Sequence, residues 1–294
     1  DTAAPYSISW NTTTATNGSH ALAARARDAA GNTATSVAVG VTVNNVVTGR
    51  VFYVAPTGSD STGDGSQANP WRQIRRALLA VRAGDTVLVG DGDYLGFTAS
   101  GLNGTAAAPI TIRAQGSGAN ILVTADRADN RDTIYITSCS YLVIDGLRAF
   151  NANRAGVRVS QSPNITVRNG VFGNNAMWGI FTDFSDDLLI ENNVTSGSRA
   201  QHGIYVSNSG DRPIVRNNES FGNTMFALQL NGDCHEGGDG RITGALVEGN
   251  RFHDNGYGSN IISTFTSTFR NNLSYNNGVR GGAGGFHFGD SEGC

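Results

Sequence analysis

The pattern of apolar and polar residues repeats along most of the chain. From residue 87 onward, short segments in which β-branched apolar residues alternate with polar ones end at aligned positions. These positions are Val89, Ile112, Ile144, Val167, Ile190, Val215, Val247 and Phe269. Five of their separations are 22 to 25 residues, and two are 32 residues. A regular period of this length is the signature of a repeat protein, in which each repeat buries its apolar face against its neighbours.

A second apolar pattern follows each of the later segments. Its inward positions are Val157, Ile180, Ile204, Leu228, Ile261 and Phe286. Two or three short strands per repeat, joined by asparagine-rich turns, predict one coil of a right-handed parallel β-helix, so the predicted fold class is all-β. Leucine-rich repeats share the period, but they need a leucine framework, whereas the repeated pattern here is I-x-V-x-N-N.

Equivalent positions of successive coils should form ladders, because neighbouring strands lie about 4.8 Å apart. One predicted ladder consists of turn asparagines whose amides can hydrogen-bond from coil to coil. Its members are Asn169, Asn192, Asn217 and Asn271. A second ladder consists of small residues, namely Cys139, Ser162, Ser185 and Gly210. Its position predicts that Cys139 is a packed core residue rather than a reactive thiol.

Residues 51–94 read as a strand, a polar loop, a helix and a strand. Apolar residues at helical spacing follow Asn69 as N-cap and Pro70 as first residue, which predicts a helix over about 70–83. The segment FYVAPTGSD, with the later GDGS and NPWRQIRRALLAVRAGDTVLVGDGDY, resembles the N-terminal segment of pectate-lyase-superfamily β-helices. That resemblance implies that the helix caps the open end of a β-helix over residues 48–294.

Residues 1–47 have a different pattern, with short alternating segments and turn signals such as Asn17-Gly18. The stretch APYSISWNT, followed by NGSHALAARARDAAGNTATS and VTV, resembles the second half of bacterial Ig-like modules. A sandwich needs two sheets to bury its inner faces, so Trp10 and Leu22 would have few partners here. We therefore expect an N-terminal partial Ig-like β-sandwich, and a chain that is truncated at both ends.

Composition narrows the function further. Charged residues make up 15% of the chain, the net charge is −3 and all 21 basic residues are arginine. This balance gives no reason to expect nucleic acid, and no apolar run is long enough for a membrane span. The Ig-like resemblance implies a secreted or cell-surface bacterial protein, which we expect to be a monomer. The three cysteines allow one bridge, for which Cys234 and Cys294 are the preferred pair, or three free thiols.

The second strands predict an exposed column of mixed chemistry. Its members are Arg158, Phe181, Tyr205, Gln229 and His287, and a parallel column holds Ser160, Asp183, Ser207 and Asn231. Rings stack on pyranose faces, amides bond hydroxyl groups, and arginine pairs with uronate carboxylates. This face suits a polysaccharide, in particular an acidic one. The alternative is an ordinary solvent-facing sheet.

Two of the coils are longer than the others, and their extra residues at 113–131 and 231–244 should leave the coil as loops. The second loop holds Asp233, His235, Glu236 and Asp239 within seven residues. Oxygens of Asp233, Glu236 and Asp239 could bind calcium, and the cluster could instead supply an acid and a base. The alternative is a solvated acidic turn.

The candidate chemistry is acid–base chemistry on a uronate. β-Elimination needs a base and a cation near the carboxylate, and β-helix lyases use lysine or arginine with calcium. The sequence contains no lysine, so His202, Tyr205, Asp233 and His235 are the catalytic candidates. His202 is either a base in the groove or a packed turn histidine.

The function predicted from these residues is an extracellular polysaccharide lyase or a related uronan-modifying enzyme. One alternative is a non-catalytic, adhesin-like stalk that binds glycans. Another is a glycoside hydrolase that uses Asp183 and Asp233, which would lie about two coils, or roughly 10 Å, apart.

Overall fold

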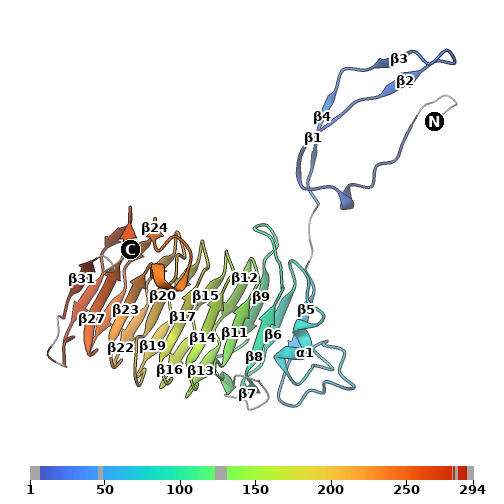
Figure 1. Cartoon of the computed structure of the whole chain (residues 1–294). Coiled ribbons are helices and arrows are strands. Elements are labelled where there is room, and N and C mark those ends of the chain that lie inside the picture. The colour runs from blue at the N-terminus through green and yellow to red at the C-terminus, as the bar shows by residue number, and fades with distance from the viewer. Residues whose placement is uncertain (1–6, 46–48, 123–130, 280, 282–283, 290–294) are drawn as a thin grey trace. The chain divides into compact units, whose positions relative to one another are not determined.

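The chain divides into two compact units, Asp1–Thr48 and Gly49–Cys294. The computed structural model describes residues 7–45, 49–122, 131–279, 281 and 284–289. Each unit is considered by itself (Figure 1). The division falls one residue beyond the boundary expected from the sequence.

The first unit is a narrow ribbon. A 3₁₀ turn at Thr12–Thr14 is followed by four short strands. These are β1 (Gly18–Leu22), β2 (Arg25–Arg27), β3 (Thr33–Thr35) and β4 (Val39–Val43). β1 pairs antiparallel with β4, and β2 with β3. Within residues 7–45 no second sheet covers this ribbon, and Ile8 and Val37 are 94% and 90% exposed. The Ig-like sandwich therefore stays a prediction.

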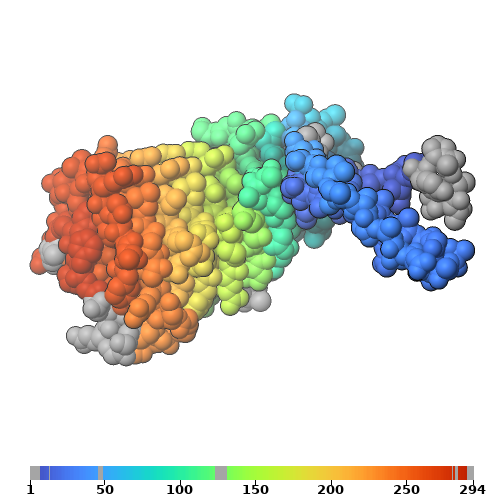
Figure 2. All heavy atoms as spheres, turned by 90° about the horizontal axis from the view of Figure 1, so that it is seen from above, coloured from blue at the N-terminus to red at the C-terminus, as the bar shows by residue number. Residues whose placement is uncertain are grey.

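The second unit is a parallel β-helix whose coils follow one another along the axis (Figure 2). Sheet A contains β5 (Val51–Val54), β6 (Thr86–Val89), β9 (Ile110–Ala114), β12 (Leu142–Asp145), β15 (Thr166–Arg168), β18 (Leu189–Glu191), β21 (Ile214–Arg216), β25 (Leu246–Glu248) and β29 (Thr268–Arg270). Sheet B contains β7 (Gly92–Leu95), β10 (Ala119–Leu122), β13 (Arg148–Phe150), β16 (Val171–Gly173), β19 (Val194–Ser196), β22 (Glu219–Phe221), β26 (Arg251–His253) and β30 (Leu273–Tyr275). Sheet C contains β8 (Phe97–Ser100), β11 (Ile134–Thr137), β14 (Ala155–Ser160), β17 (Trp178–Asp183), β20 (Ile204–Ser207), β23 (Phe226–Asn231), β27 (Tyr257–Ile262) and β31 (Phe286–Gly289). The chain passes through A, B and C in turn, which confirms the predicted β-helix.

The interior of sheet C follows the predicted spacing over most of its length. Val157, Ile180, Ile204 and Leu228 pair in register from β14 to β23, and all four are fully buried. The prediction is wrong at Ile261, which pairs with Leu230, while Ser259 pairs with Leu228. The loop after β23 lengthens this coil, so spacing alone did not locate the register. Phe286 pairs with Ser259 and returns to the predicted column.

The asparagine ladder exists, but its predicted register is wrong by one residue. The predicted members have left-handed backbones, with φ of 55° to 56°, and form the turn itself. The buried ladder consists of the residues that follow in each turn, namely Asn193, Asn218, Asn250 and Asn272. Each side-chain carbonyl accepts the backbone N–H at the equivalent position one coil earlier, which is Gly170 for Asn193 and an asparagine for the other three, at 2.9 to 3.0 Å. A second ladder, Asn223, Asn255 and Asn277, repeats this arrangement at the turn from sheet B to sheet C.

The small-residue ladder is confirmed. The backbone N–H groups of Cys139 and Ser162 donate to the hydroxyl groups of Ser162 and Ser185, each at 3.0 Å. Cys139 is a free, buried thiol, and burial raises its pKa. Cys234 is disulfide-bonded. Its expected partner, Cys294, lies outside the described residues.

The helix near the start of the β-helix is shorter than predicted. α1 spans Ile74–Leu78 rather than about 70–83, and its N-cap residue is Gln73 rather than Asn69. Trp71 instead forms a parallel bridge with Val54, so its backbone extends sheet A. The apolar face of α1 is buried against β5, β6 and β8, as the resemblance implied (Figure 1). No helix in the described part of the chain is both long enough and apolar enough to span a membrane.

Candidate functional site

The outer face of sheet C carries one side chain per coil in a central column. In order these are Thr98, Tyr135, Arg158, Phe181, Tyr205, Gln229, Asn260 and His287. The five residues predicted from the sequence therefore share a column. Thr98, Tyr135 and Asn260 complete it, and the sequence analysis did not include them.

The middle of this column is less exposed than predicted. The Arg158 guanidinium lies between the rings of Tyr135 and Phe181, at 5.2 and 5.4 Å from their centroids. It also pairs with Asp183 Oδ2 at 2.9 Å, while the Ser160 hydroxyl donates to Asp183 Oδ1. Phe181 and Asp183 are only 9% and 3% exposed. The prediction that they are solvent-facing is wrong, because the preceding coil supplies a partner for each.

A second aromatic column borders the first, and the sequence analysis missed it. Its members are Trp178, His202, Phe226 and Tyr257, one at or just before the start of each strand. The signal was present in the sequence, since each aromatic residue stands two positions before an inward position and is followed by glycine or alanine. The small residue is needed, because a Cβ on Gly179 would lie 2.7 Å from the carbonyl oxygen of Gly203. The rings of Trp178 and His202 contact Tyr205, so they lie on the outer face of sheet C.

The rings on this face stack mainly on one another. Phe181 stacks on Trp178 and on Tyr205, with centroids 4.3 and 5.4 Å apart. His202 stacks on Phe226 at 5.3 Å, and Phe226 contacts Tyr257 at 5.3 Å. A sugar ring that stacks needs a free aromatic face. Phe181 is 9% exposed and also contacts the Arg158 guanidinium, so it supports its neighbours rather than offering a free face.

The Tyr205 hydroxyl group is the most chemically distinctive point on this face. Its oxygen accepts a hydrogen bond from Asn231 Nδ2 at 3.4 Å. Burial raises the pKa of Tyr205, and the nearby charges of Asp233 and Glu236 act in the same direction. The phenol therefore keeps its proton at neutral pH. Asn231 contacts the Tyr205 hydroxyl and accepts the Asp233 N–H at 3.3 Å, so these three candidates lie together.

His202 lies beside Tyr205, with ring centroids 5.4 Å apart in an edge-to-face arrangement. The side chain is 4% exposed, and its Nδ1 accepts the Phe226 N–H at 3.3 Å, which places the proton of the neutral ring on Nε2. Burial lowers its pKa to about 3. Of the two alternatives left open for His202, this geometry matches the packed turn histidine.

The loop after β23 stands beside Asn231 and carries the other candidates. A 3₁₀ turn at Cys234–Glu236 begins at Asp233, whose carboxylate accepts the His235 N–H at 3.2 Å. The loop is fixed to the preceding coil by the Gly240 N–H, which donates to Ser209 Oγ at 3.0 Å. Glu236 and His235 are exposed.

The arrangement of the loop does not assemble a metal site. Across the described residues, no group of three His, Cys, Asp or Glu side chains is placed to hold a metal ion. Asp233 is engaged with the His235 N–H, and Asp239 Oδ1 accepts the Arg241 N–H at 3.0 Å. Calcium binding by Asp233, Glu236 and Asp239 stays a prediction.

The sequence model of a family described as "Right handed beta helix region" matches residues 110–274. The chain belongs to this right-handed β-helix family. The match covers the sheet C strands from β11 to β27 and the loop after β23.

Individual proteins similar to this β-helix protein share only 14% to 30% of the aligned residues with it. Mannuronan C5-epimerase AlgE5 from Azotobacter vinelandii is 30% identical over 96 residues, which are 33% of this chain and 9% of that protein. Among solved structures, pectate lyase Pel9A superposes with a TM-score of 0.53 and 18% identity, covering 79% of this chain and 78% of that one. The lacto-N-biosidase of family GH136 from Eubacterium ramulus has a TM-score of 0.53 and 14% identity, covering 76% and 55%. At identities of 18% and 14%, these superpositions show a shared β-helix fold and no more than that.

Two remaining candidates of the β-helix lie apart from Tyr205. His287 is exposed, and its Nδ1 lies 3.0 Å from Asn260 Oδ1, three strands along sheet C from Tyr205. The prediction of a loop over 113–131 is wrong at its start, because Ala119–Leu122 form β10 of sheet B, while residues 123–130 lie outside the described residues. The candidate site is therefore the group formed by Tyr205, Asn231 and the loop after β23.

Proposed function

We propose that this β-helix binds a polysaccharide along the outer face of sheet C and acts on it at Tyr205. In this proposal the protein is an extracellular bacterial enzyme, a polysaccharide lyase or a related uronan-modifying enzyme, and works as a monomer. The observation that carries the proposal is the protonated Tyr205 hydroxyl group, which lies beside Asn231 and next to a loop of acidic and histidine side chains.

Tyr205 acts as the proton donor in this proposal. In β-elimination a base removes the C5 proton of a uronate, its electron pair forms the new double bond, and the glycosidic oxygen on C4 leaves and needs a proton. The Tyr205 phenol is protonated at neutral pH and can supply that proton. The Asn231 amide already donates to the phenol oxygen, so it stabilises the negative charge that develops as the proton leaves.

The base is assigned to the loop after β23. Asp233 and His235 stand there, and Asp233 lies close enough to influence the Tyr205 pKa. His202 is a poor base because burial lowers its pKa to about 3. In the neighbouring subsite Arg158 donates Nε and Nη2 to Asp183, which leaves Nη1 to meet a sugar carboxylate.

The geometry weighs against a hydrolase that uses Asp183 and Asp233. Both oxygens of Asp183 accept hydrogen bonds from protein groups, one from Arg158 and one from Ser160. A buried carboxylate engaged in this way is not available to activate water or to protonate a leaving group. A glycan-binding stalk would instead bind sugar on the same face without turnover.

The proposal is tested with the purified chain on pectate, alginate and glycosaminoglycans. Ultraviolet absorbance detects the conjugated product of elimination, and NMR detects inversion at C5. Replacing Tyr205 with phenylalanine should lower turnover by at least about 100-fold, since general acid–base catalysis contributes roughly 10²- to 10⁴-fold. Tyr257→Phe is the matched control on the same face, and it should change turnover less than about twofold.

Three results would decide against the proposal. Full activity of Tyr205→Phe would remove Tyr205 from the chemistry. Equal losses in Tyr205→Phe and Tyr257→Phe would point to a general effect on the sheet. Binding of a polymer without any turnover would favour the glycan-binding stalk.

A further inference from the structure

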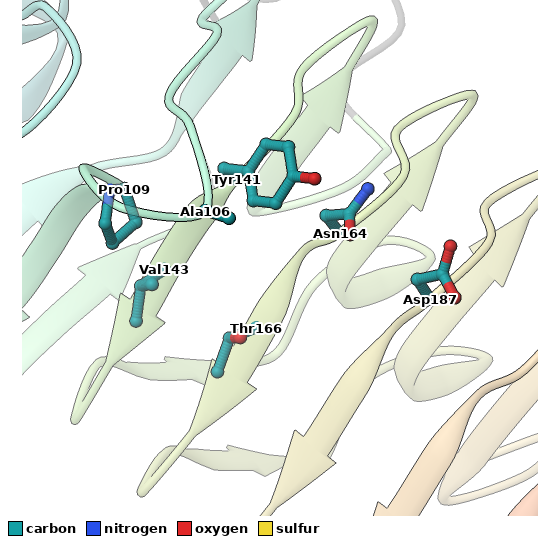
Figure 3. Close-up of a pocket in the computed structure, with 7 residues that line it drawn as sticks. All are labelled: Ala106, Pro109, Tyr141, Val143, Asn164, Thr166 and Asp187. Carbon is teal, nitrogen blue, oxygen red and sulfur yellow. The ribbon is translucent and has the colours of Figure 1, made fainter. Parts of the chain in front are cut away.

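A hollow lies on the outer side of sheet A, around the corner from the face described above. Its volume is about 300 Å³, which is at the small end of the range for ligand pockets and fits one sugar ring. Figure 3 shows the loop between β8 and β9, represented by Ala106 and Pro109, on one side of it. Tyr141 stands next to this loop. The strands β12 and β15 form the floor.

The hollow has apolar side chains on one side and polar side chains on the other. Ala106, Pro109 and Val143 supply apolar surface, and the Tyr141 ring adds an aromatic wall. Asn164, Thr166 and Asp187 supply an amide, a hydroxyl and a carboxylate along the opposite side (Figure 3). A pyranose has C–H groups on its faces and hydroxyl groups around its rim, so it presents the same two kinds of surface.

The wall of the hollow is held in place before any ligand arrives. The Gly104 N–H donates to the Ser140 carbonyl at 2.9 Å, and the Ser140 hydroxyl donates to Asn103 Oδ1 at 2.9 Å. The Ile110 N–H donates to the Tyr141 carbonyl at 3.0 Å. A Cβ on residue 104 would lie 2.5 Å from that carbonyl oxygen, so the loop approaches Tyr141 closely only because Gly104 has none.

The corner residues share an uncommon backbone conformation. Tyr141, Asn164 and Asp187 have φ of 49°, 58° and 55° at equivalent turns of three successive coils. Asparagine and aspartate adopt this left-handed region readily, whereas tyrosine does so rarely. The turn sequence alone therefore gives no reason for a tyrosine at position 141, while an aromatic wall beside the hollow does.

Charge identifies the kind of sugar. Asp187 is the one charged residue among those that line the hollow, and its oxygens accept from Arg212 Nε and Nη2 at 2.7 and 2.9 Å. A carboxylate held in this way can still accept hydrogen bonds from sugar hydroxyl groups. No lining residue is basic, and the nearby Arg212 guanidinium is already engaged by Asp187 and Asp186, so the lining offers no free cation to pair with a uronate carboxylate.

We propose that this hollow is a binding subsite for one neutral pyranose residue. The Tyr141 ring contacts a face of the sugar, and Asn164, Thr166 and Asp187 bond its hydroxyl groups. The subsite does not depend on catalysis at Tyr205. Its coils also carry Tyr135, Arg158 and Phe181 on sheet C, so the occupant is either a free neutral oligosaccharide or a neutral branch on a polymer bound to that face.

The test is calorimetric titration with neutral oligosaccharides of gluco, galacto, manno and xylo configuration, with oligouronates as the charged comparison. Amide chemical-shift mapping on the same samples should locate the bound sugar at residues 104–110, 141–143 and 164–166. Thr166→Val removes one hydroxyl hydrogen bond and should raise the Kd about fivefold. Thr268→Val makes the same change in the same column of sheet A, four strands away, and should leave the Kd unchanged.

Tyr141 gives a second, independent readout. Tyr141→Ala should weaken binding more than Tyr141→Phe, which keeps the aromatic wall, and thermal melting shows that each variant is folded. Binding of short neutral oligosaccharides identifies a free ligand as the occupant. Binding of a branched polymer but not of its unbranched backbone identifies a branch.

Three outcomes would overturn the proposal. The first is no binding by any neutral sugar or branched polymer. The second is an equal loss of affinity in Thr166→Val and Thr268→Val. The third is tighter binding of oligouronates than of neutral sugars at the mapped residues. These outcomes concern sugar binding at the hollow and do not change the turnover expected of Tyr205→Phe, so either proposal can be refuted without the other.

Discussion

The buried asparagine ladder at the turn from sheet A to sheet B allows a direct test of how the coils are held together. Asn218 accepts hydrogen bonds from the backbone N–H and the side-chain amide of Asn193, at 3.0 and 3.1 Å. Its own amide donates to the Ile190 carbonyl at 2.8 Å and to Asn250 Oδ1 at 3.0 Å. Asn218→Ala removes all four contacts while the backbone path stays available to alanine.

The free energy of unfolding should fall by about 3 kcal/mol. The Asn193 N–H loses its acceptor, and the Ile190 carbonyl loses the amide donor, at a site where Asn218 is 1% exposed. Each buried polar group left without a partner costs about 1 to 3 kcal/mol, and the small cavity adds to the loss. For a chain of this size the midpoint of thermal unfolding should fall by about 6 to 12 °C.

Asn217→Gly is the control for this prediction. Asn217 is exposed and has φ of 55°, a conformation that glycine adopts without strain. It should change the free energy of unfolding by less than about 0.5 kcal/mol. Urea unfolding, followed by circular dichroism and tryptophan fluorescence, measures both variants. A larger loss in Asn217→Gly than in Asn218→Ala would refute the reasoning and restore the register predicted from the sequence.

Three further outcomes are expected. Burial lowers the pKa of His202 to about 3 from its ordinary 6.5, so unfolding takes up a proton below pH 6.5. The contribution of His202 to the free energy of unfolding is complete above pH 6.5 and falls by up to about 1.4 kcal/mol per pH unit below it. Urea midpoints measured against pH should lack this component in His202→Phe. The same dependence on pH in the variant and the parent protein would contradict this reasoning. Limited proteolysis should cut within residues 7–45 before it cuts the β-helix, because Ile8 and Val37 are almost fully exposed. Equal resistance of both units to the protease would show that residues 7–45 are better packed than this ribbon. Phe181→Ala should lower stability by about 3 kcal/mol in thermal melts, because its buried ring packs against Trp178, Tyr205 and Arg158. A variant that lost sugar affinity at unchanged stability would return Phe181 to the binding surface.

The sequence predicted the fold well wherever coils follow one another without insertions. Val157, Ile180 and Ile204 stand 23 and 24 residues apart, and they stack because each coil takes nearly the same path. The register failed at Ile261, because the loop after β23 changes the residue count without changing the stacking. The asparagine ladder failed by one position, because two asparagines stand together at 192–193, 217–218 and 271–272, and only the backbone φ decides which one faces inward.

The candidate site was predicted less completely. Alternation within a strand correctly placed Tyr205 and Gln229 on the outer face. It could not show that Asp183 is buried, because the partner that covers it is Arg158, which belongs to the previous coil. The hollow beside Tyr141 had no signal in the sequence, because it arises from a loop and a turn that are 30 or more residues apart in the chain.

The hydrogen bonds between coils also affect the rate at which asparagine residues of this protein deamidate. An asparagine followed by glycine is prone to deamidation, because the glycine nitrogen attacks the side-chain carbonyl and closes a succinimide ring. The described β-helix holds five such pairs, at 103–104, 169–170, 231–232, 255–256 and 277–278. In each pair the glycine N–H already donates to a neighbouring coil, at 2.9 to 3.3 Å. The nitrogen that would start the reaction is thereby held away from the adjacent amide, so the stacking that forms the fold also protects its most labile peptide bonds.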